Sequence, residues 1–167
     1  MPLQFQLNGM STLELSVAFI LSPTNDYSAG LSPPMISIRA ESVPDHPSQF
    51  AVELIVHIAP LGDAAVGYRI VSHTLAGCSI IGDGGAPAET RRLAAINSAT
   101  ILYGALRGQL AGMTGNFPGG VLLLPAVYMA EIWRQQEESI PSEAAESVVS
   151  ARKPKSRKKP SKSARKK

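Results

Sequence analysis

Apolar and polar residues alternate along the first half of the chain, and this alternation predicts β-strands. The clearest case is residues 50–58, where every even-numbered position is apolar. The same period of two occurs at residues 36–41 and 13–21, and a shorter run at residues 3–7 is separated from the latter by the turn signal Asn8 and Gly9. Residues 60–63 form a second turn signal, so residues 66–81 are expected to return antiparallel to 50–58. The first 81 residues therefore indicate a β-rich half.

After the glycine-rich residues 82–85 the period changes to that of a helix, with Pro87 and Glu89 in its first turn. The expected buried face carries large residues at three- and four-residue steps: Leu93, Ile96, Thr100, Tyr103, Leu106, Leu110 and Met113. Beside this face lie Gly104, Gly108 and Gly112. Each interior glycine costs about 1 kcal/mol relative to alanine. Their spacing predicts that the backbone of another helix or strand approaches closely.

Residues 114–120 break this helix, residues 121–124 form a short extended run, and Pro125 is expected to begin a second helix that ends near Glu138. This hinge is unusually apolar for one loop and one short helix. Each apolar residue could be core, but exposed apolar surface in a globular protein marks an interaction site. We therefore consider a groove that accepts extended apolar segments of another chain, with these candidates: Phe117, Leu122, Leu124, Val127, Tyr128 and Trp133.

The formal charge of +3 combines two unlike parts. Residues 1–150 contain thirteen acidic and six basic residues and no lysine, a net of −7, whereas residues 151–167 contain ten basic residues and no acid. We therefore divide the chain into a folded domain, 1–138, and a Ser/Glu/Ala-rich then Lys/Arg-rich tail, 139–167, that is expected to be disordered. The tail could shield the acidic body or contact a polyanion such as nucleic acid, without reading its sequence. The candidate polyanion contacts are Arg152, Lys153, Lys155, Arg157, Lys158 and Lys159.

Catalytic and metal-binding patterns are weak. His57 and His73 could lie on adjacent strands, but two imidazoles without a third ligand make a poor metal site, and Cys78 is expected to be a small buried residue. Residues 82–85 precede a helix but lack the ending of a phosphate-binding loop. We therefore expect no enzyme activity and no cofactor. Without a basic N-terminal region or an apolar run of about 20 residues, the sequence predicts a cytoplasmic protein that does not insert into membranes.

The order of four expected strands, a long helix, a Phe-Pro break, Leu-Leu-Pro and a short second helix resembles the SecB protein-export chaperones and their SecB-like relatives. The resemblance covers roughly residues 3–138. It rests on an Asn, Leu and Arg pattern in the long helix, then Phe-Pro, then Leu-x-Pro, at these positions: Asn97, Leu102, Arg107, Phe117, Pro118, Leu124 and Pro125. Tyr103 and Gly104 stand where the family usually has Pro-Tyr, and the basic tail is foreign to the acidic members. The chain is therefore similar to a divergent member.

This resemblance implies an α+β fold in which a four-stranded antiparallel sheet is followed by a long helix and a short C-terminal helix. It also implies a homotetramer, a dimer of dimers in which Gly104, Gly108 and Gly112 allow helices to cross closely. The implied function is ATP-independent holding of unfolded polypeptide in apolar grooves. The client would be a preprotein, with a SecA-type motor as partner, or a dedicated client such as an antitoxin. The alternative, from another class, is a nucleic-acid-associated accessory protein that acts through its tail.

Overall fold

The computed structural model describes residues 4–20, 32–60, 67–81, 88–117 and 119–139. Four strands precede two helices, in the order β1 (Gln4–Ile20), β2 (Met35–Val43), β3 (His46–Ile58), β4 (Gly67–Ile81), α1 (Ala88–Thr114) and α2 (Met129–Ser139). This confirms the predicted α+β fold with a four-stranded sheet, a long helix and a short helix. The loop at 82–87, Pro118 and the tail at 140–167, with its six candidate polyanion contacts, lie outside the described residues.

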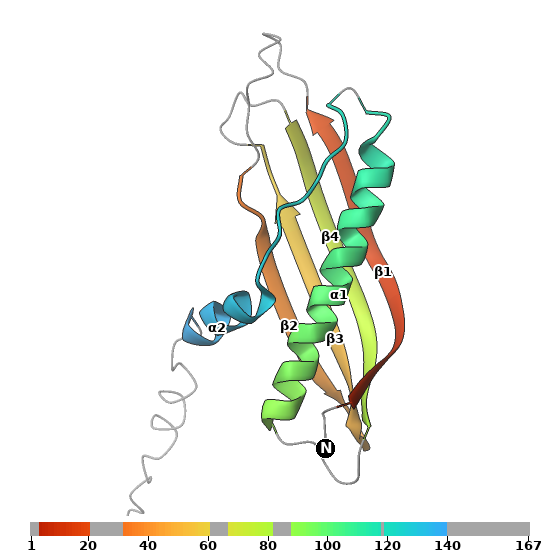
Figure 1. Cartoon of the computed structure of the whole chain (residues 1–167), viewed down its shortest axis with the longest axis vertical. Helices are drawn as coiled ribbons and strands as arrows, with labels where there is room; N and C mark the ends of the chain where they lie inside the picture. The colour runs from red at the N-terminus through yellow and green to blue at the C-terminus, as the bar shows by residue number, and fades with distance from the viewer. Residues whose placement is uncertain (1–3, 21–31, 61–66, 82–87, 118, 140–167) are drawn as a thin grey trace, which may run out of the picture.

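The sheet has the strand order β1-β4-β3-β2, and every neighbouring pair is antiparallel. The hairpin predicted between residues 50–58 and 66–81 is present as the β3–β4 pair. Between β2 and β3 the chain turns tightly at Asp45, whose φ of 63° lies in the left-handed region that aspartate tolerates better than most residues. Helix α1 crosses one face of the sheet, and α2 lies beside β2 (Figure 1).

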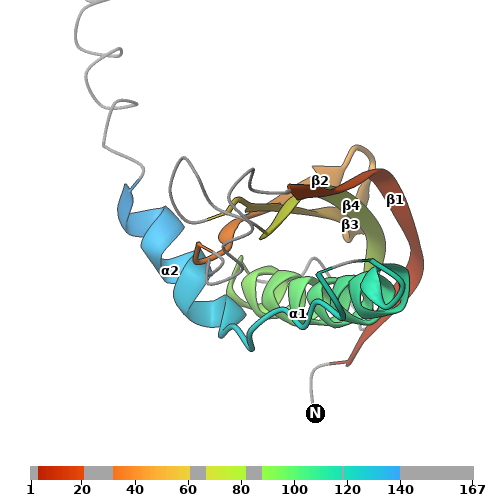
Figure 2. The same ribbon diagram turned by 90° about the horizontal axis from the view of Figure 1, so that it is seen from above.

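The core lies between this sheet face and α1, and the curved sheet wraps over the helix (Figure 2). Even-numbered side chains of β3 and β4 point toward α1, because alternate residues of a strand face opposite sides of the sheet. Leu54 and Ile70 from the sheet and Leu102 from α1 are almost completely buried. For β3, the alternation at residues 50–58 that predicted the strand therefore also identified the side chains that form the core.

Strand β1 corrects the prediction of two strands separated by a turn at Asn8 and Gly9. It is continuous along β4, with register shifts between Leu7 and Gly9 and between Thr12 and Glu14. The Asn8 side-chain amide donates a hydrogen bond to Ser79 Oγ on β4 at 2.6 Å. Glycine and asparagine tolerate a bulge as readily as a turn, and here the long β4 strand keeps β1 paired on both sides of it.

The buried side of α1 is also partly different from the predicted one. Leu93 and Met113 remain 44% and 42% exposed, and Thr100 is exposed as well. Small residues fill the contact with the sheet instead, including Ala94, Ala95, Ser98 and Ala99, all with no exposed surface. A search for large apolar residues misses such a face, because alanines allow the helix axis to lie close to the sheet.

Helix α2 begins at Met129 and not at Pro125 as predicted. The first helical carbonyl is that of Tyr128, which accepts hydrogen bonds from the backbone N–H groups of Glu131 and Ile132. The carbonyl of Pro125 is bonded instead to the Tyr103 hydroxyl of α1 at 3.0 Å. Residues 125–128 therefore continue the extended segment.

Neither described helix is long and apolar enough to cross a bilayer.

Candidate functional site

Residues 120–128, which we call the strap, connect α1 to α2 as an extended segment across the sheet (Figure 1). Three hydroxyls hold its backbone. The Tyr68 hydroxyl donates to Gly120 O at 2.5 Å, the Tyr103 hydroxyl donates to Pro125 O, and Thr114 Oγ1 accepts from the Leu122 N–H at 2.8 Å. No backbone ladder between the strap and a strand occurs in the described part of the chain. The strap is therefore positioned by side chains, which leaves much of its main chain available.

Side chains of the strap alternate between the core and the solvent. Leu122 and Leu124 are 5% and 1% exposed, whereas Leu123 is 72% exposed and Val121 is 58% exposed. Tyr128, at the end of the strap, is 76% exposed. Of the predicted groove residues, Leu122 and Leu124 therefore belong to the core of the folded chain, and the sequence reading missed Val121 and Leu123. Four consecutive apolar residues carry no polar position that would have marked the outward face.

The remaining predicted groove residues are partly buried. Phe117 packs on Tyr68 with ring centroids 6.2 Å apart, and Tyr68 packs in turn on Phe19 at 5.1 Å. These rings secure the start of the strap. Val127 and Trp133 pack against the edge of the core. Of the six predicted residues, Tyr128 alone is exposed, and Trp133 lines the hollow described next.

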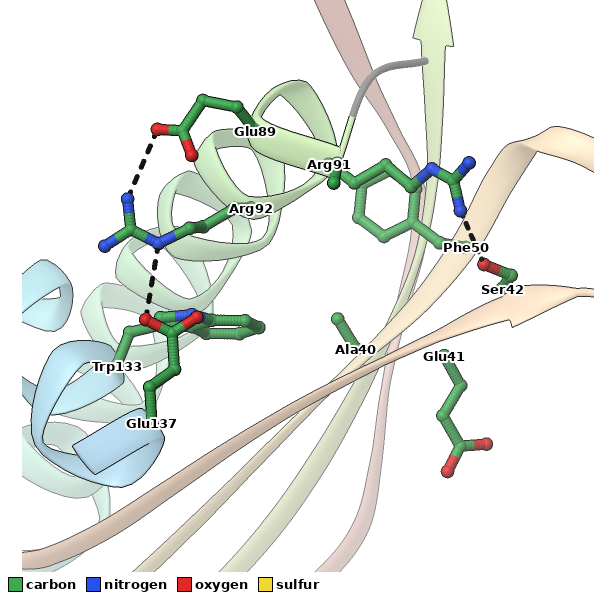
Figure 3. Close-up of a pocket in the computed structure, with 10 residues that line it drawn as sticks. Ala40, Glu41, Ser42, Phe50, Glu89, Arg91, Arg92, Trp133 and Glu137 are labelled. Carbon is green, nitrogen blue, oxygen red and sulfur yellow. Dashed lines mark hydrogen bonds and ion pairs between the residues drawn. The ribbon is translucent and has the colours of Figure 1, made fainter. Parts of the chain in front are cut away.

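A hollow of about 330 Å³ lies where β2, the start of α1 and α2 meet (Figure 3). Its lining combines aromatic and apolar side chains with charged ones. The lining residues are Ala40, Glu41, Ser42, Phe50, Ala88, Glu89, Arg91, Arg92, Trp133 and Glu137. Its size lies at the lower end of the range for ligand pockets. The hollow is large enough for one bulky side chain.

The charged rim of this hollow is organised around Arg92. The guanidinium contacts Glu89 at 3.2 Å and Glu137 of α2 at 3.7 Å, and Glu137 also accepts a hydrogen bond from Trp133 Nε1 at 2.8 Å (Figure 3). Arg91 donates to Ser42 Oγ at 3.2 Å. These contacts are exposed, so each contributes little to stability. They set the orientation of Trp133 at one wall of the hollow.

The outward side of α1 forms a second exposed surface. Gly104, Gly108 and Gly112 lie on it, and a Cβ atom built on any of them would meet nothing within 4 Å. The prediction of a close backbone neighbour is therefore wrong within the chain itself. Leu93 and Ile101 are partly exposed on the same helix. The described chain thus presents a helix surface that combines large apolar side chains with glycines.

The residues that carried the family resemblance divide between core and surface. Leu102 is completely buried, whereas Asn97, Arg107 and Pro125 are exposed, and Pro118 lies outside the described residues. Burial raises the pKa of the Tyr103 hydroxyl above its ordinary value, and the nearby Arg107 charge lowers it to a smaller extent. The hydroxyl is therefore neutral at physiological pH and donates a hydrogen bond to Pro125 O.

The described residues offer little for catalysis or metal binding. His73 Nε2 lies 2.5 Å from Glu53 Oε1, and Arg39 contacts the other oxygen of Glu53 at 3.6 Å. Cys78 is buried with Sγ at 3.1 Å from Ser98 Oγ, and burial raises the pKa of its thiol. A thiol that is harder to ionise is a poor nucleophile. No group of three or more His, Cys, Asp or Glu residues suited to a metal occurs among the described residues.

Comparison with solved structures identifies the fold. The chain is similar to a SecB-like chaperone of Mycobacterium tuberculosis, solved in complex with a ChAD peptide from the HigA1 antitoxin. The TM-score is 0.58 at 18% sequence identity, over 74% of this chain and 90% of the other. No protein-family model and no curated protein matches the sequence. The predicted resemblance to the SecB-like chaperones is therefore confirmed in the fold.

Proposed function

We propose that the protein is a chaperone that binds unfolded polypeptide without nucleotide. The observation that carries this proposal is the SecB-like fold together with exposed Leu123 and Tyr128 on a strap whose backbone lacks a strand partner. Burying apolar surface contributes about 25 cal/mol per Å² whatever the sequence of the client. Main-chain hydrogen bonds to an extended client are equally independent of its side chains. Both interactions suit a protein that recognises the unfolded state.

The test is suppression of aggregation of a chemically denatured client on dilution, in the absence of ATP. The double variant Leu123→Ser and Tyr128→Ser should hold the client several-fold less well, because it removes the exposed apolar side chains of the strap and leaves buried Leu122 and Leu124 unchanged. The double variant Met10→Ser and Leu13→Ser is the matched control, since these side chains are 49% and 57% exposed but lie on β1. A wild-type chain that leaves the client to aggregate would refute the proposal.

The related chaperone binds a peptide from an antitoxin. We infer that a dedicated client of that kind fits this chain better than the export route. The sheet face remote from α1 carries Glu53, but Arg39 and His73 contact that carboxylate. At Glu53, therefore, the acidic charge is paired with a cation, which favours the dedicated client over a SecA-type motor. Binding of the ChAD peptide of the HigA1 antitoxin, compared with binding of a preprotein segment, would separate the two routes.

We further propose that copies of the chain assemble through α1 into a homotetramer. Gly104, Gly108 and Gly112 would let helices approach closely, and Leu93 and Ile101 would bury their exposed surface there. Gly108→Arg should reduce the native mass, which a mass measurement under non-denaturing conditions would detect. Gln109→Arg adds the same side chain one residue further along α1 and is the control. Equal masses for both variants and the wild type would contradict assembly through the glycine surface.

A second function, nucleic-acid association through the tail, is favoured by the ten basic residues at 151–167. Each neutralised phosphate would lower the logarithm of the binding constant by about 0.9 per decade of salt. Deleting residues 151–167 should abolish any shift of DNA or RNA in a gel and leave client holding intact. Unchanged nucleic-acid binding after the deletion would exclude the tail as its origin.

A further inference from the structure

The free edge of the sheet is not open along its whole length. Within the part of the chain that the structure describes, β2 is the last strand of the sheet on this side and pairs only with β3. The Ile38 N–H points away from β3, because it donates a hydrogen bond to Gln136 Oε1 of α2 at 3.0 Å. In an antiparallel pair the N–H and C=O groups of alternate residues point to the same side. Ile36 and Ala40 therefore present their main chain to the same outer edge as Ile38.

Gln136 occupies this edge as a neighbouring peptide unit would. Its carboxamide oxygen accepts from the Ile38 N–H, while its Nε2 donates to Ser37 Oγ at 3.3 Å. A carboxamide has the same donor and acceptor groups as a backbone amide. One side chain thus satisfies an edge donor that would otherwise be open to another strand.

Helix α2 packs against the core through its first half, where Ala130, Ile132 and Trp133 are partly buried. Met129, its first residue, is the only one that is fully buried. The second half of α2 is attached by the Gln136 contacts and by the exposed ion pair between Arg92 and Glu137. Breaking these contacts would free that half of the helix without opening the core between α1 and the sheet.

The hollow lies directly beside the same edge. Ala40 and Ser42 line it together with Phe50 and Trp133 (Figure 3). Cross-strand neighbours direct their side chains to the same face of a sheet. A residue of an added antiparallel strand opposite Ala40 would therefore direct its side chain toward this hollow and would itself pair with the Ala40 main chain.

We propose that an extended client adds to the β2 edge as a further strand and that Gln136 is a competing cap there: the carboxamide and the client contend for the Ile38 N–H. This inference rests on the proposed chaperone function and adds its regulation. A client that pairs along β2 displaces Gln136 and releases the second half of α2. In the absence of a client, the cap keeps the β2 edge from pairing with other chains. It also lowers the binding affinity of every client by the same factor.

The experiment compares Gln136→Ala with Gln135→Ala. Both changes replace a glutamine by alanine on α2, but Gln135 is exposed and bonds Glu131, remote from β2. The probe is a fluorescein-labelled extended apolar peptide of about fifteen residues, followed by fluorescence anisotropy. Gln136→Ala should bind it about two- to tenfold more tightly than the wild type, the worth of one competing hydrogen bond. Gln135→Ala should bind it as the wild type does.

Amide hydrogen exchange at Ile38 supplies a second readout. In the free protein Gln136→Ala should expose the Ile38 N–H and accelerate its exchange, and saturating peptide should protect it again. Unchanged exchange in the free variant, unchanged affinity, or an equal gain in Gln135→Ala would each overturn the cap. If the wild type neither binds the peptide nor prevents aggregation, the chaperone function itself fails. Peptide binding with no difference between the variants would refute the cap alone.

Discussion

Helices α1 and α2 are attached to the same sheet in different ways. α1 buries a continuous side along its length, with Ala95, Ala99 and Leu102 fully enclosed. α2 buries only Met129 completely; Ala130, Ile132 and Trp133 pack partly against the core, and polar groups hold its second half. The strap between the helices combines both modes, with buried leucines and hydroxyl contacts. The rigid part of the molecule is therefore the sheet with α1, and the part available for exchange with a partner is the strap with α2.

The largest effect should come from breaking the rigid part. Leu102→Ala removes a completely buried side chain between α1 and the sheet, and should lower the free energy of unfolding by about 2–5 kcal/mol. Chemical denaturation measures this loss. Leu13→Ala, at a residue that is 57% exposed on β1, is the control and should change stability by less than about 1 kcal/mol. Similar losses at both sites would contradict the assignment of the core.

Removing a buried hydroxyl at the start of the strap should have an intermediate effect. Thr114 Oγ1 donates to Leu110 O at 2.7 Å and accepts from the Leu122 N–H. Thr114→Val leaves that N–H without an acceptor, at a cost of about 1–3 kcal/mol in unfolding free energy. Thr100→Val is the matched control, because its hydroxyl also bonds a carbonyl of its own helix but holds no part of the strap. A loss of unfolding free energy in Thr100→Val but not in Thr114→Val would contradict the proposal that Thr114 holds the strap.

The Tyr103 contact should be weaker and local. Tyr103→Phe deletes the hydroxyl that holds Pro125 O and should cost about 0.5–1.5 kcal/mol. The strap should become more dynamic, and amide exchange at residues 121–127 would show it. Tyr128→Phe changes the same group at a residue that is 76% exposed, and should leave exchange unaltered. Equal exchange in the wild type and Tyr103→Phe would mean that the strap is held elsewhere.

The smallest effect concerns alkaline pH and the contact between β4 and α1. Burial raises the pKa of the Cys78 thiol, so the folded state favours its neutral form. That contribution to stability is complete below the ordinary thiol pKa of about 8.5 and is lost as the pH rises through the raised folded value. Unfolding free energy should therefore decline above that pH less steeply in Cys78→Ala than in the wild type. Parallel profiles for the two proteins would contradict a titration at Cys78.

The comparison of the two helices also explains what could be read from the sequence. Alternation at residues 50–58 identified β3 and its inward side chains, because the two-residue repeat of a single strand already separates buried from outward positions there. The strap gave no such signal, because Val121, Leu122, Leu123 and Leu124 are all apolar and only the tertiary contacts distinguish their directions. Gln136 could not be selected either, since its role depends on β2, nearly a hundred residues earlier in the chain.

The hydroxyl contacts of the strap have a consequence for its register. A slip by one residue would exchange the buried pair Leu122 and Leu124 for Val121 and Leu123, and hydrophobicity alone would hardly oppose it. Tyr68, Thr114 and Tyr103 each bond a particular backbone atom, so they fix which residues face inward. Polar groups thus choose between two nearly equivalent apolar arrangements. Residues 121–124 are all apolar, so without these three side chains the strap could adopt either register.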